Sequence, residues 1–111
     1  MYNFETNQDI LDIIEKCSDK EKLVDVYSFV WEECQKNKFH IEDYKWKSLA
    51  NHISAMVERA HTKGEFEGIE VEMFNEISSE ALSLAKAIVD KIENLHENEM
   101  YLLSVHFEAA K

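Results

Sequence analysis

Five histidines and two cysteines are the side chains of this 111-residue sequence best suited to act as nucleophiles, proton carriers or metal ligands. Cys17 and Cys34 each fall within an apolar helical stripe, a pattern that favours small buried hydrophobic residues over redox or metal chemistry. The sequence has no Cys-x-x-Cys pair, which argues against a zinc site of the usual type. The five histidines are His40, His52, His61, His96 and His106.

A Glu-x-x-His pattern occurs twice, as Glu58 with His61 and as Glu93 with His96. Two such pairs on different helices, joined by two more glutamates, can build a di-iron carboxylate site in a helical bundle. Glutamate is so frequent in this sequence that such pairs also arise by chance. Helical geometry turns Glu58 and His61 towards water, and it places His96 at the end of its helix. A metal-binding bundle is therefore retained only as an alternative.

His52 and His106 are placed differently with respect to the apolar faces of their helices. His52 and Arg59 are two turns apart and within about 20° of one line, at the border of an apolar face, so both side chains can reach a groove between helices. His106 falls within apolar surface, with Ser104 and Glu108 on the polar side. Taken singly, His106 is also compatible with a hydrogen-bonded core histidine and His52 with a surface position.

The elements that must position these residues are helices, because the chain has no proline and its apolar residues follow a helical period. We expect a single all-α domain over residues 1–111, a compact bundle of about five helices. A capping box formed by Ser18 and Glu21 predicts where the second helix begins. The last helix is apolar on nearly every side, which predicts a central position. Residues 61–68 read as a loop, and 71–77 fit either a loop or one extra turn. The helices are expected at about 7–17, 18–37, 42–60 and 79–96, and from about Asn98 towards the C-terminus.

The composition of the chain argues against nucleic-acid binding, membrane insertion and disorder. The formal charge is −11 and Arg59 is the only arginine, which argues against direct nucleic-acid binding. No apolar run approaches the roughly 20 residues that a bilayer requires, and no secretory signal is evident, so we expect a cytoplasmic protein without membrane contact. With 45% hydrophobic residues the chain is too apolar to be disordered.

Two segments together resemble the histidine motifs of the PRD, the phosphotransferase-system regulation domain. LANHISAMVERA, residues 49–60, resembles the first motif, in which Leu, His-Ile and a distal Arg share one helix. NEMYLLSVHFEAA, residues 98–110, resembles the second, in which an acidic residue and an apolar run precede the histidine. SSEALSLAKAIVDKIENLH resembles the helix between them, so the resemblance covers about residues 44–110.

The resemblance implies a PRD-like five-helix bundle in which His52 and His106 face a shared site and accept phosphate. The donor would be the carrier HPr or a sugar-specific enzyme II, and Arg59 would bind either the phosphate or a carboxylate that holds the groove. Of the two acceptors, His52 is expected to lie nearer solvent and to be the better nucleophile.

The implied function is that of a stand-alone regulatory domain that modulates transcription or sugar metabolism, and we expect it to form a homodimer. It would not be an enzyme and would need no cofactor. Besides the metal-binding bundle, the alternative is a helical interaction or dimerisation module without phosphate chemistry.

Overall fold

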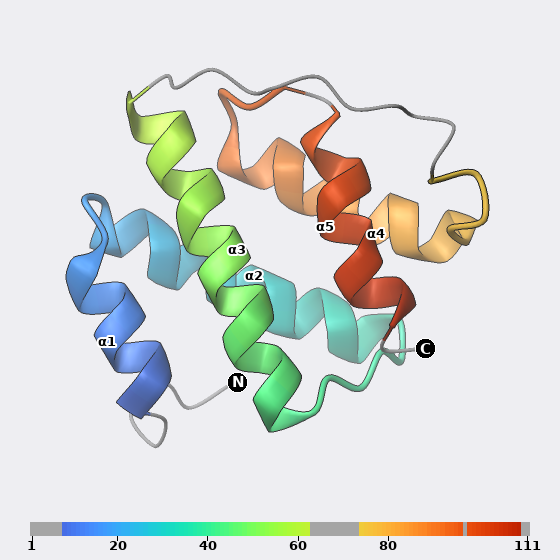
Figure 1. The fold of residues 1–111 in the computed structure, drawn as a ribbon, viewed down its shortest axis with the longest axis horizontal. Coiled ribbons are helices and arrows are strands. Elements are labelled where there is room, and N and C mark those ends of the chain that lie inside the picture. The colour runs from blue at the N-terminus through green and yellow to red at the C-terminus, as the bar shows by residue number, and fades with distance from the viewer. Residues whose placement is uncertain (1–7, 63–73, 97, 110–111) are drawn as a thin grey trace.

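Five helices make up the fold in the computed structural model, which describes residues 8–62, 74–96 and 98–109 (Figure 1). Every regular element in these ranges is helical, so the prediction of an all-α bundle is confirmed. No helix among the described residues is both long and apolar enough to cross a membrane. The helices are α1 (Gln8–Lys16), α2 (Lys20–Lys36), α3 (Asp43–Thr62), α4 (Ser79–Ile92) and α5 (Glu99–Glu108).

The helix at the centre of the bundle is α3, which contacts each of the other four helices. In Figure 1 it runs diagonally across the molecule, with α1 on one side and α5 on the other. The prediction that the last helix is central is wrong, because α5 packs chiefly on α4 and leaves Val105 46% exposed. The apolar face of α3 carries Leu49, Ile53 and Met56, all essentially inaccessible to water.

The start of α2 differs from the predicted capping box. Asp19, not Ser18, is the N-cap, and its carboxylate accepts a hydrogen bond of 3.2 Å from the backbone N–H of Lys22. Ser18 instead donates through its backbone N–H and its hydroxyl to the carboxylate of Glu58, on α3. Because a distant carboxylate binds Ser18, the helix begins one residue later and takes the next capping side chain along the chain.

The end of α4 also differs from the prediction, because the helix stops at Ile92 and not near residue 96. Glu93 and Asn94 have positive φ values of 66° and 58°, which a right-handed helix cannot continue through. His96 therefore lies in the connection to α5, where its Nδ1 accepts a hydrogen bond of 3.0 Å from the backbone N–H of Asn98.

The segment between α3 and α4 is only partly described. Of the loop predicted at 61–68, His61 and Thr62 belong to α3, and 63–68 lie outside the described residues. Of the ambiguous stretch 71–77, residues 71–73 also lie outside them. Phe74–Ile77 form a turn closed by a backbone hydrogen bond of 3.1 Å. Ser78 then caps α4, accepting from the N–H of Ala81.

Candidate functional site

The imidazoles of His52 and His106 are in direct contact. Nδ1 of His52 lies 3.1 Å from Nε2 of His106, and the ring centroids are 5.1 Å apart. One ring comes from the middle of α3 and the other from the last two turns of α5. The two histidines singled out from the sequence are 54 residues apart in the chain, and the packing of α3 and α5 brings them together.

The contact between the two rings couples their tautomers. A neutral imidazole has one N–H and one lone pair, so a hydrogen bond between the two rings requires one of them to donate and the other to accept. Two nitrogens remain outside the contact, Nε2 of His52 and Nδ1 of His106. When both rings are neutral, one of these carries a proton and the other a lone pair. The pair thus always presents one nucleophilic nitrogen.

Burial keeps both rings in the neutral form. It is the largest influence on His52, followed by the neighbouring His106 and then Arg59, and together they lower the pKa of His52 from 6.5 to about 4. Burial likewise lowers the pKa of His106. Both side chains are half-buried, so the difference in depth expected between them is not found. At neutral pH the site holds two uncharged imidazoles.

A buried ion pair lies beside the histidines on the same two helices. Arg59 donates from Nε to Oε1 of Glu99 over 3.1 Å, and Nη2 of Arg59 binds the same oxygen. Glu99 is 1% exposed, whereas the side chain of Arg59 is 29% exposed. Of the two partners expected for Arg59, phosphate or carboxylate, the structure contains the carboxylate.

Glu99 is a site residue that was not predicted from the sequence. A signal for it was present, because Glu99 is the acidic residue of the second histidine motif. It precedes His106 by seven residues, as His52 precedes Arg59 by seven. Seven residues make almost two full turns, so each helix presents its two side chains on one face. Because α3 and α5 are antiparallel, a single alignment of the two helices produces both contacts. His52 lies opposite His106, and Arg59 lies opposite Glu99.

The residues of the two Glu-x-x-His patterns do not come together. The carboxylate of Glu58 accepts hydrogen bonds from Ser18, and His61 is exposed at the end of α3. His96 lies after α4 and bonds the backbone of Asn98. Within residues 8–62, 74–96 and 98–109, no three His, Cys, Asp or Glu side chains are grouped so that they could hold a metal ion.

The two cysteines are buried, as their positions in apolar stripes predicted. Cys17 is 5% exposed and Cys34 is 4% exposed. Burial raises the pKa of both thiols, that of Cys34 to about 12, so both are protonated at neutral pH. A protonated, buried thiol is a poor nucleophile and a poor metal ligand.

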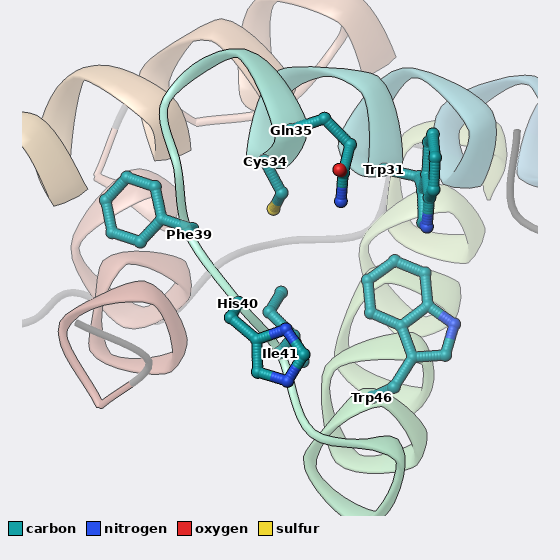
Figure 2. A pocket seen from close by; sticks show the side chains of 7 residues that line it. All are labelled: Trp31, Cys34, Gln35, Phe39, His40, Ile41 and Trp46. Atoms are coloured by element: carbon teal, nitrogen blue, oxygen red, sulfur yellow. The ribbon is translucent and has the colours of Figure 1, made fainter.

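Two of the cavities near the start of α3 are lined by histidine side chains. One, of about 140 Å³, is lined by His106 together with side chains from the first turns of α3 and from the end of α5. The other, of about 200 Å³, lies between α2 and α3 and is lined by Trp31 and Trp46, with His40 and Ile41 on the connecting segment (Figure 2). Neither His52 nor His106 lines this second cavity.

Comparison with known proteins identifies a family and a similar solved structure. The model of the PRD domain family matches residues 27–110, which include both histidines. The fold is similar to the crystal structure of a PRD-containing transcription regulator from Lactobacillus casei ATCC 334, with a TM-score of 0.89 and 30% sequence identity. That similarity covers 93% of this chain and 92% of the other. None of the curated proteins matches the chain.

Proposed function

Because the chain belongs to the PRD domain family, as its two histidine motifs indicated, we propose that it is a regulatory domain controlled by phosphorylation of His52 or His106. The observation that carries the proposal is the 3.1 Å contact between two neutral imidazoles on different helices. Histidine accepts a phosphoryl group through the lone pair of a neutral ring, and this pair always offers one such nitrogen.

The phosphoryl donor in this proposal is the carrier HPr or a sugar-specific enzyme II. The free imidazole nitrogen attacks the phosphorus of the donor's phosphohistidine in line with the bond that breaks, and the donor ring leaves with the bonding electron pair. Such a transfer depends mainly on positioning and charge stabilisation. The domain itself is not an enzyme in this proposal, and it requires no cofactor.

Phosphorylation would act on the contact between α3 and α5. A phosphoryl group adds nearly two negative charges to a chain whose formal charge is already −11. Placed on either histidine, that charge competes with Glu99 for Arg59. Loss of Arg59 would leave the carboxylate of Glu99 buried without its cation, which costs up to about 3 kcal/mol. A shift of α5 on α3 relieves this cost, and that shift is the proposed regulatory signal.

The output of the domain is proposed to be control of transcription or of sugar metabolism through a protein contact. The similar protein from Lactobacillus casei is a PRD-containing transcription regulator. We propose that this chain acts in the cytoplasm as a homodimer and does not itself bind nucleic acid or a membrane. Its acidic composition, with Arg59 as its only arginine, supports the absence of a nucleic-acid surface.

The test is incubation with enzyme I, HPr and phosphoenolpyruvate, followed by a search for acid-labile, base-stable phosphate on the protein. We expect labelling that falls in His52→Ala or His106→Ala and disappears in the double variant. Labelling that persists in the double variant would contradict the assignment of the site.

A second candidate function is an interaction module in which the same histidine pair is purely structural. The half-burial of both rings favours it, because a hydrogen-bonded pair of neutral histidines can simply fill a helix interface. This alternative predicts no labelling by any donor, together with a stable oligomer or complex.

A further inference from the structure

Three side chains of α3, spaced seven residues apart, contact α5 in succession. Arg59 binds Glu99, His52 contacts His106, and Nζ of Lys45 donates a hydrogen bond of 3.2 Å to the backbone carbonyl of Ala109. The seven-residue spacing keeps all three on one face of α3. The histidine pair therefore lies between two cations, one on each side along the helix.

The two cations differ in how their charge is compensated. The charge of Arg59 is neutralised by the buried carboxylate of Glu99. Lys45 is held by a backbone carbonyl near the end of α5, and a carbonyl orients an ammonium group without cancelling its charge. Lys45 is thus the cation that remains available to a new anion at this site.

The cavity beside the histidine pair contains the same lysine. It has a volume of about 140 Å³ and is lined by His106, Lys45 and Ser48, with Ile41, Leu49 and Ala109 completing the wall. His52 is not among the lining residues. Ser48 lies three residues after Lys45, so the hydroxyl and the ammonium group share a face of the helix. Ser48 is exposed and Lys45 is half-buried, which leaves the cavity accessible from solvent.

From this arrangement we propose that Lys45 and Ser48 form a phosphoryl-binding subsite and that His106, rather than His52, is the first acceptor. The inference rests on the proposed function and names the regulation of the same site. Lys45 neutralises the incoming charge and Ser48 donates a hydrogen bond to a phosphoryl oxygen. His52 acts as a positioning residue, because its Nδ1 accepts the N–H of His106 Nε2 and so leaves the lone pair of His106 on Nδ1.

The transfer step balances without any added reactant. The lone pair of His106 Nδ1 forms the new N–P bond, and the N–P bond of the donor's phosphohistidine breaks with its electron pair going to the donor nitrogen. His106 keeps the proton on Nε2, which is hydrogen-bonded to His52. The donor's phosphohistidine ring is protonated before transfer and neutral after it, so its positive charge passes to the ring of His106. Lys45 compensates the phosphoryl charge, which Arg59 reaches only by releasing Glu99.

The test uses phosphoramidate, a small histidine-phosphorylating reagent, in parallel with phosphorylated HPr. The variants are Lys45→Gln, Lys45→Arg and Ser48→Ala. The control is Lys47→Gln, since Lys47 lies 3.7 Å from Asp9 and lines a different cavity. Phosphorylation sites are mapped by mass spectrometry under basic conditions, and circular dichroism checks that each variant is folded.

We expect the wild-type protein to be labelled first at His106. Lys45→Gln should slow labelling about fivefold, the effect of losing one partly exposed charge, and Ser48→Ala about twofold. Lys45→Arg should retain the rate, and Lys47→Gln should leave it unchanged. Equal rates for Lys45→Gln and the wild type, or first labelling at His52, would overturn the inference.

The two donors separate this inference from the proposed function. Labelling of His106 by phosphoramidate with the expected response to Lys45→Gln, but none by HPr, supports the subsite and contradicts HPr as the donor. Labelling of the wild type by HPr that is insensitive to Lys45→Gln supports the proposed function and rejects the subsite. Absence of labelling with both reagents rejects both.

Discussion

Arg59 and Glu99 form an ion pair in which the carboxylate is almost completely buried. The pair lies on the same faces of α3 and α5 as the contact between His52 and His106. Arg59 follows His52 by seven residues on α3, and Glu99 precedes His106 by seven on α5. The only arginine of the chain is thus committed to holding the two histidine-bearing helices in register. Arg59 is therefore not available to bind an incoming anion unless its ion pair with Glu99 breaks.

Removal of Arg59 should destabilise the fold more than removal of the whole pair. Arg59→Met leaves the carboxylate of Glu99 buried without its cation, and we expect a loss of up to about 3 kcal/mol, at the lower end for a broken buried pair because Arg59 is partly exposed. The double variant Arg59→Met with Glu99→Met should recover much of the loss. Urea denaturation monitored by circular dichroism measures both. A cost below 0.5 kcal/mol for the single variant, as is common for surface pairs, would show that the pair is not buried in solution.

Stability should fall as the pH drops through the range in which free histidine titrates. The folded-state pKa of His52 is about 4, below its ordinary value of 6.5, so the unfolded chain binds the proton more readily. The contribution of neutral His52 to the unfolding free energy is complete above about pH 6.5 and is lost progressively as the pH falls towards 4. His106 acts in the same direction because burial also lowers its pKa.

We therefore expect a decrease of about 1–2 kcal/mol in unfolding free energy between pH 7 and pH 5. The double variant His52→Gln with His106→Gln serves as the control and should show a much flatter profile. This window lies above the ordinary carboxylate range, so Glu58, whose pKa is lowered by its hydrogen bonds from Ser18, contributes little to the slope. An equally steep profile in the double variant would assign the slope to other groups.

The start of α2 should depend on Asp19 and not on the residues of the expected capping box. Asp19→Ala removes the carboxylate that accepts the N–H of Lys22 and should cost about 1 kcal/mol. Glu21→Ala should change the unfolding free energy by less than about 0.5 kcal/mol, as for an ordinary surface substitution. Thermal denaturation of the two variants in parallel gives the comparison. A larger loss of unfolding free energy for Glu21→Ala than for Asp19→Ala would show that the capping box forms in solution.

Both cysteine thiols should be protected from reagents in the folded protein. Each is at least 95% buried, and burial raises the pKa of each, so the reactive thiolate is scarce. We expect negligible reaction with an aromatic disulfide reagent at pH 8 over minutes, and reaction of both thiols in urea. Rapid reaction of one thiol under native conditions would mean that α1 or α2 opens locally.

The sequence allowed the helical class, most helix positions and the key pair of histidines to be predicted. The apolar period and the absence of proline indicated helices, and the two motifs pointed to His52 and His106. At the start of α2 the prediction was wrong because a residue distant in the chain decides the local structure. Ser18 is bound by Glu58, so the cap of α2 moved to Asp19. Glu93 and Asn94, whose φ values are positive, end α4 within an unbroken helical pattern of sequence.

By itself the sequence determined which side chains share a face of a helix, because the angle between successive residues is fixed by backbone geometry. That was sufficient to place His52 with Arg59 on α3. The helical period did not indicate which side chains lie opposite them. The resemblance to the PRD family implied that His52 faces His106, and only the tertiary structure showed the partners of Arg59 and Lys45. The antiparallel packing of α3 and α5 places Arg59 opposite Glu99, His52 opposite His106, and Lys45 opposite the end of α5. Such pairings depend on how two helices align in space. The apolar period of one helix contains no information about which residues of the neighbouring helix lie opposite it.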